Sequence, residues 1–150
     1  MQVREVMTAE PICATPETPL QKVAALMTEN RCGAIPIVDN GRIAGIVTDR
    51  DIVCRAVARG INPQALKASD VMTRRVATIA ADQHAEAAEA VMKKRHVRRL
   101  LVVDNEGHIV GIVSATDLAI MTEELASGVM FPKLTGHVPK KTSPKFRTWL

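Results

Sequence analysis

The chain contains two copies of one sequence unit, and this internal repeat constrains the fold more than any other feature. The first copy opens with Val6-Met7-Thr8 and closes with Gly45-Ile46-Val47-Thr48-Asp49-Arg50-Asp51. The second opens with Val71-Met72-Thr73 and closes with Gly111-Ile112-Val113-Ser114-Ala115-Thr116-Asp117. Each copy is too short to bury a good core alone. Two copies packed face to face would share one core and form two related clefts, so the repeat predicts a paired binding module.

The composition supports a packed core and argues against one class of nucleic-acid binding. Hydrophobic residues make up 47% of the 150 positions, which suits one compact domain. Aromatic residues make up 2% and there is no Tyr, so aliphatic side chains and Met must fill the core. The scarcity of aromatic rings disfavours the stacking platforms on which single-stranded nucleic acids bind.

The formal net charge of +4 is concentrated at the C-terminal end of the chain. Residues 131–150 contain five Lys and Arg and no acidic residue, whereas residues 1–130 are close to neutral. A basic segment of this kind is compatible with contact to RNA, DNA or an anionic membrane. A solvated extension or an oligomer-contact arm is the commoner alternative.

The cysteine and histidine positions indicate neither a disulfide framework nor a metal site. The three cysteines (Cys13, Cys32 and Cys54) all lie in the first copy, without metal-site spacing. An odd count of this kind indicates reduced thiols and a cytoplasmic protein, and we interpret Cys13 as a small buried residue. The histidines show no metal-ligand spacing, and no nucleophile–base set indicates an enzyme. No apolar run approaches the ~18 residues that would span a membrane.

Turn and cap residues predict the same order of elements in both copies, strand–helix–strand–strand–helix, and therefore an α/β (α+β) fold with pseudo-two-fold symmetry. The first helix of each copy should be capped by Thr18, with Pro19 at its first position, or by Asp82. Asn40-Gly41 is a two-residue hairpin turn. Thr48 and Ser114 should cap the closing helices. The expected strands are 12–14, 35–39, 42–47, 77–79, 99–104 and 108–113, and the closing helices run to about Arg59 and Ser127.

These elements divide the chain into repeat 1 (residues 1–60), a linker (61–67), repeat 2 (68–127) and a basic tail (128–150). A short helix should open each repeat, around 3–7 and 68–72. The tail contains Pro132, Pro139 and Pro144 and shows no sustained periodicity, so we expect weak order there unless it docks on a partner.

The closing motifs have a chemistry that suits a nucleotide. Thr48 and Ser114 stand where a strand meets a helix N-terminus, and the unpaired amides there favour an anion. Asp51 and Asp117 follow three residues later, where a carboxylate can accept hydrogen bonds from both ribose hydroxyls. The alternative is a capping box, which needs no ligand.

With the apolar strand ending in Asp39 or Asp104 before each of them, these motifs resemble the CBS domain, and the tandem resembles a Bateman module over about residues 1–127. The resemblance implies a stand-alone regulatory pair, not an enzyme, that binds AMP, ADP, ATP, S-adenosylmethionine or NAD in clefts between the repeats. It also implies phosphate contacts from Arg98 and Arg99, with His96 nearby, where the first copy has Gly33 and Ala34. The clefts would then be unequal. The implied base contacts are Ile12, Cys13, Ala14, Ala77, Thr78 and Ile79.

The family also pairs its outer helices, which implies a homodimer that signals to an unknown protein partner. The apolar residues available for this are Ile52, Val53, Ala56, Leu118, Ala119 and Met121. Two further hypotheses stay open. One is a nucleic-acid or ribosome-associated factor that uses residues 131–150, and the other is a structural interaction module with vestigial clefts.

Overall fold

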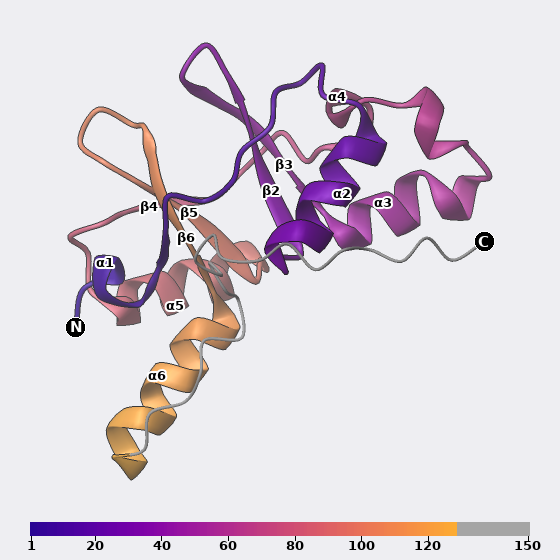
Figure 1. Cartoon of the computed structure of the whole chain (residues 1–150). Coiled ribbons are helices and arrows are strands. Elements are labelled where there is room, and N and C mark those ends of the chain that lie inside the picture. The colour runs from indigo at the N-terminus through magenta and orange to yellow at the C-terminus, as the bar shows by residue number, and fades with distance from the viewer. Residues whose placement is uncertain (129–150) are drawn as a thin grey trace.

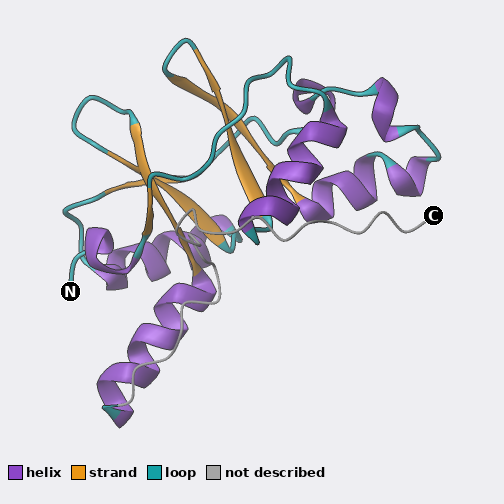
Figure 2. Ribbon diagram, in the orientation of Figure 1, coloured by secondary structure: helices purple, strands orange, loops and turns teal. Residues whose placement is uncertain are grey.

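The computed structural model describes residues 1–128 and places two similar α/β halves side by side (Figures 1 and 2). Each half contains an antiparallel hairpin and two packed helices. The last helix, α6, projects away from the body of the molecule (Figure 1). Within residues 1–128 there is no helix whose length and hydropathy would let it cross a bilayer.

The first half is built around a hairpin and two helices. Its elements are α2 (Leu20–Asn30), β2 (Ala34–Asp39), β3 (Arg42–Thr48), α3 (Asp49–Arg55) and the 3-10 helix η1 (Val57–Arg59). The predicted hairpin turn is confirmed, since Asn40 and Gly41 both have positive φ, at 49° and 77°. That conformation matches the twist of the flanking strands. The predicted closing helix is shorter than expected, because it ends at Arg55 and a separate 3-10 turn follows.

The second half repeats this order. Its elements are β4 (Thr78–Ala80), α5 (Ala85–Arg95), β5 (Arg99–Val103), β6 (Ile109–Ser114) and α6 (Ala115–Ser127). The longer hairpin turn is held by Asp104, whose Oδ1 accepts hydrogen bonds from the amides of Glu106 and His108, both at 2.9 Å. The predicted hairpin and the Ser114 cap are both confirmed.

Both halves form a sheet with the same arrangement. In the second half the order is β1-β6-β5-β4, with β1 (Thr8–Ala9) antiparallel to β6 and β4 parallel to β5. In the first half, single bridges take the places of the outer strands, between Ile46 and Thr73 and between Ala14 and Ile37. The predicted pseudo-two-fold pair of repeats is confirmed. The expected strand 12–14 is wrong, because only Ala14 pairs there.

The two halves exchange their opening helices, α1 (Val3–Val6) and α4 (Ala68–Val71). Val3 and Val6 are buried in the core of the second half, whereas Ala68 and Val71 are buried in the core of the first. The anchoring hydrogen bonds are equivalent on the two sides. The amide of Val3 donates to the Gln83 carbonyl, and that of Ala68 to the Thr18 carbonyl, both at 2.8 Å. Neither hydrophobic core is therefore formed by one continuous stretch of sequence.

This exchange explains why two predicted helix caps are wrong. Helix α2 begins at Leu20 after Pro19, and the Thr18 hydroxyl instead accepts from the amide of Thr15 at 3.0 Å. The amide of Leu20 donates to the carbonyl of Leu66 at 2.9 Å. A backbone acceptor from the linker thus satisfies an amide that a side-chain cap would otherwise serve.

The second wrong cap has the same cause. Helix α5 begins at Ala85, with His84 and not Asp82 as its N-cap residue. The amide of Ala85 donates to the carbonyl of Met1 at 3.0 Å. A distant segment supplies this acceptor, so local sequence could not predict it.

Candidate functional site

A cavity lies where the two halves meet, and both halves contribute to its wall. The segment before α2 supplies three residues, the end of α2 and the start of β2 supply four, and the second half supplies four more. The lining residues are Thr8, Pro11, Ile12, Asn30, Cys32, Gly33, Ala34, Arg99, Ile112, Ser114 and Asp117.

The closing motif of the second repeat forms the polar end of this cavity. Ser114 ends β6 and caps α6, and the amide of Asp117 donates to the Ser114 hydroxyl at 3.2 Å. Asp117 Oδ2 accepts hydrogen bonds from the Ser114 amide at 2.8 Å and the Ser114 hydroxyl at 2.7 Å. Both residues are buried, with exposed fractions of 7% and 8%. The amides at the start of α6 add a partial positive charge, which favours an anion.

Arg99 brings a guanidinium group to the same cavity. It begins β5, opposite Ser114 in the strand register. A Cβ atom placed on Gly33 would lie 3.3 Å from Arg99 Nη2 and 3.0 Å from Asp49 Oδ2. The side chains of Arg99 and Asp49, from different halves, therefore converge on Gly33, and the missing side chain there leaves them room.

The structure separates Arg99 from the other two predicted phosphate contacts. Arg98 is exposed, is not part of the cavity lining, and accepts a hydrogen bond from the amide of Ala115 through its carbonyl. His96 is also exposed and ends α5 in a left-handed conformation with φ of 55°. Consecutive residues of a strand point to opposite faces, which accounts for the different surroundings of Arg98 and Arg99.

The six residues predicted to contact a base are spread over different environments. Ile12 lines the cavity, whereas Cys13 is exposed and Ala14 is buried in the first core. The interpretation of Cys13 as a buried residue is wrong, because its segment passes over the surface, and its thiol donates to the Pro11 carbonyl at 3.3 Å. Ala77, Thr78 and Ile79 stand at the equivalent place in the second repeat, outside this cavity.

Several cavity residues were not predicted from the sequence. Thr8, Pro11, Asn30, Cys32 and Ile112 belong to different elements and meet only through packing of the two halves. The internal repeat is the sequence signal that could have pointed to them, through the equivalent positions of the two copies. Burial raises the pKa of the Cys32 thiol, although the nearby Arg99 guanidinium acts in the opposite direction. Burial at the cavity wall thus opposes ionisation of this thiol.

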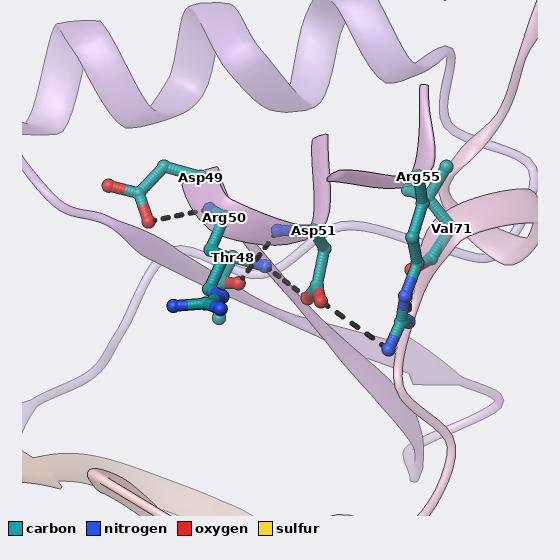
Figure 3. Close-up of polar contacts among 6 residues, drawn as sticks. All are labelled: Thr48, Asp49, Arg50, Asp51, Arg55 and Val71. Carbon is teal, nitrogen blue, oxygen red and sulfur yellow. Dashed lines mark hydrogen bonds and ion pairs between the residues drawn. The ribbon is translucent and has the colours of Figure 1, made fainter. Parts of the chain in front are cut away.

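The closing motif of the first repeat has the same cap but a different neighbour (Figure 3). Thr48 donates its amide to Asp51 Oδ2 at 2.9 Å and accepts from the Asp51 amide at 3.1 Å. Asp51 Oδ1 also lies 3.6 Å from Arg55 Nη2, and Arg55 Nη1 donates to the Val71 carbonyl at 2.7 Å. Met121 stands at the position equivalent to Arg55 in the second repeat. The two motifs thus differ in charge at the position four residues after the carboxylate.

The polar residues of these two motifs do not form a metal site. Within residues 1–128, no group of three or more His, Cys, Asp and Glu side chains is placed to hold a metal ion. The chemistry that the motifs offer is that of hydrogen-bond acceptors and an anion-binding helix end.

The fold and the two closing motifs define the class of protein. The CBS domain family model matches residues 3–57 and 68–122, and the chain belongs to this family as a tandem CBS pair. Among curated proteins, CBS domain-containing protein YhcV of Bacillus subtilis is 35% identical over 130 residues, which cover 85% of this chain and 91% of YhcV.

Two solved structures illustrate what relatives hold. Hypoxic Response Protein I with two coordinated zinc ions is 32% identical, with a TM-score of 0.70 over 79% of this chain and 97% of that one. The CBS domain pair of protein MJ0100, in complex with 5′-methylthioadenosine and S-adenosyl-L-methionine, is 26% identical, with a TM-score of 0.76 over 83% and 98%. Adenosine-containing ligands thus bind to at least one relative of this fold.

Proposed function

We propose that this protein is a regulatory module that binds an adenosine-containing ligand of the AMP, ADP or ATP class in the cavity at Asp117. One observation carries the proposal. A buried carboxylate at a helix N-terminus, a guanidinium group and an apolar wall line the same cavity between the two halves. These are the groups that a ribose, a phosphate and a base need.

Each part of the ligand has a matching group in this proposal. The Asp117 carboxylate accepts hydrogen bonds from the ribose hydroxyls. The Arg99 guanidinium binds phosphate, because its planar fork can hold two phosphate oxygens at once. Pro11, Ile12 and Ile112 pack against the adenine. The ligands of MJ0100 support the adenosine part of this assignment, and Arg99 favours a phosphorylated ligand over S-adenosylmethionine, with NAD compatible as well.

We further propose that ligand binding is reported to an unknown protein partner through the arrangement of the two halves, in a cytoplasmic homodimer and without catalysis. Exposed apolar side chains on α3, on the 3-10 helix η1 that follows it and on α6 support an association surface. Val53, Val57 and Leu125 are exposed at 56%, 58% and 67%. A ligand that bridges the two halves would favour one arrangement of them and so shift the population of states that the partner meets.

A thermal-shift panel tests this proposal. The full chain is heated with AMP, ADP, ATP, NAD, S-adenosylmethionine and GTP. A ligand at about 100 times its dissociation constant adds ~2.7 kcal/mol of stability, which gives a clear shift. The proposal expects shifts with adenine nucleotides and their loss in Asp117→Asn. No shift with any adenine ligand, on folded protein, would favour an interaction module. The hypothesis of a nucleic-acid factor depends on residues 131–150, which lie outside the described residues.

A further inference from the structure

We infer that the Asp49 carboxylate restricts the phosphate end of the cavity to a ligand with one phosphate group, so that AMP is preferred over ADP and ATP. The inference deepens the proposed function and rests on its assignment of Arg99 to the phosphate. Arg99 attracts the first phosphate group, and the negative charge of Asp49 beside it repels the groups that follow. Asp49 is thus a specificity-determining residue that comes from the opposite half of the molecule.

Asp49 reaches the cavity wall at Gly33. A Cβ atom placed on Gly33 would lie 3.0 Å from Asp49 Oδ2 and 3.3 Å from Arg99 Nη2, so the two charged groups approach the same point. Gly33 and its neighbour Cys32 line the cavity and also an open groove between α2 and α3 that contains Asp49. The carboxylate therefore stands beside the guanidinium at the edge of the cavity, where phosphate groups beyond the first would come close to it.

The Cys32 thiol at the cavity wall is influenced by both charges. Burial raises the pKa of this thiol, and in addition the Arg99 guanidinium lowers the pKa whereas the Asp49 carboxylate raises it. A nearby charge acts in this way on any charged group close to it. A phosphate group held at the same wall is therefore within reach of both the attraction and the repulsion.

Backbone contacts hold Asp49 in this position. Its amide donates to the Gly33 carbonyl at 3.1 Å, and its Oδ1 accepts from the Arg50 amide at 2.9 Å, which leaves Oδ2 close to Gly33. In Figure 3 the carboxylate points away from Arg55. Within residues 1–128 no basic side chain forms an ion pair with Asp49, so its negative charge is not neutralised there.

The second repeat forms the same junction of strand and helix without a carboxylate. Ala115 stands at the position equivalent to Asp49. The amide of Ala115 donates to the Arg98 carbonyl at 2.9 Å, as the amide of Asp49 donates to the Gly33 carbonyl. The hairpin and the helix start therefore do not need the charge of Asp49, and variants that remove this charge should keep the fold.

Calorimetry of the full chain with AMP, ADP and ATP, with EDTA or with Mg²⁺, tests the inference. In EDTA the wild type should bind AMP at least about threefold more tightly than ATP. Asp49→Asn should raise the affinity for ATP about three- to tenfold more than the affinity for AMP, as expected from removing one charge at an exposed site. This gain should shrink in about 0.5 M salt, because salt screens exposed charges, whereas a purely structural effect would not.

Three further variants complete the experiment. Asp49→Glu keeps the charge and should retain the preference for AMP. Asp39→Asn removes an exposed carboxylate of the same half outside the cavity and should change no affinity. Should Asp49→Asn fail to fold, Asp49→Ala copies the second repeat and removes the same charge.

The outcomes separate the inference from the proposed function. Tighter binding of ATP than of AMP by the wild type in EDTA, or a ratio of the two affinities that Asp49→Asn and Asp49→Ala leave unchanged, would overturn the role of Asp49 alone. Tighter ATP binding with Mg²⁺ that Asp49→Asn abolishes would also overturn it, because the carboxylate would then bind phosphate through the metal. No AMP binding by the wild type and Asp49→Asn, or AMP binding unchanged in Asp117→Asn, would overturn the proposed site.

Discussion

Ser114 and Asp117 are joined by three hydrogen bonds across the first turn of α6. Asp117 Oδ2 accepts from the amide and the hydroxyl of Ser114 at 2.8 Å and 2.7 Å, and the Asp117 amide donates back to that hydroxyl at 3.2 Å. The pair lines the cavity, whereas in the first repeat the equivalent Asp51 lies 3.6 Å from Arg55. The same local motif therefore has different surroundings in the two repeats.

Removal of either cap hydroxyl should lower the free energy of unfolding by a similar amount but should have different effects on AMP affinity. Ser114→Ala and Thr48→Ala each delete an N-cap, at a cost of about 1 kcal/mol in the free energy of unfolding. Urea denaturation measures this cost, and AMP titration measures affinity. AMP affinity should fall only in Ser114→Ala. Equal loss of affinity in both variants would contradict the assignment of the cavity.

Arg99 and Arg98 form a matched pair for testing the phosphate contact. Arg99→Ala should weaken AMP binding about tenfold or more, because it removes a charge-assisted contact, and should leave 5′-methylthioadenosine almost unaffected. Arg98→Ala, at an exposed neighbouring position outside the cavity, should change neither ligand. Calorimetry with both ligands measures the difference. A larger effect of Arg98→Ala would reverse the assignment.

The glycines of the closing motifs are required by packing. A Cβ on Gly45 would lie 2.7 Å from the carbonyl oxygen of Thr73, and one on Gly111 would strike the Met7 sulfur and lie 3.1 Å from the Thr8 carbonyl oxygen. Each Gly→Ala variant should cost about 1–3 kcal/mol, as overpacking does. Thr8 lines the cavity, so Gly111→Ala should also weaken AMP binding, as measured by titration of folded protein. A melting temperature equal to that of the wild type in both variants would contradict this account.

The exchanged opening helices should make the two halves unfold together. Val3→Ala and Val71→Ala each remove two methyl groups from fully or almost fully buried sites, at 0% and 2% exposure, in opposite cores. Each should cost about 2 kcal/mol and keep a single urea transition when circular dichroism is compared with the reactivity of the partly buried Cys32. Separate transitions for the two cores would show that the exchange does not couple them.

The sequence correctly predicted the elements that are formed by residues close to one another along the chain. The Asn40-Gly41 turn, the Thr48 and Ser114 caps and both hairpins depend on residues close in sequence, and the repeat itself implied the two-fold relation. The wrong caps at Thr18 and Asp82 share one cause, since the amides of Leu20 and Ala85 bond to distant carbonyls.

The candidate site was predicted only in part for the same reason. Ser114, Asp117, Arg99 and Ile12 were identified from the motif and the resemblance, and they meet in one cavity. Asp49 and Arg55 were not singled out, although both stand beside the predicted motif. Their contacts are with Gly33 and Val71, which lie far from them in sequence.

The central claim is that the cavity at Asp117 binds an adenine nucleotide, and calorimetry of AMP with Asp117→Asn and Asp51→Asn tests it most directly. Asn keeps the size of the side chain and one acceptor for the Ser114 amide, so the fold should be retained. We predict that Asp117→Asn weakens AMP binding at least about tenfold, as loss of charged hydrogen bonds to a ribose would, and that Asp51→Asn leaves it within about twofold. Unchanged AMP binding by Asp117→Asn, or loss of AMP binding in Asp51→Asn, would contradict the account.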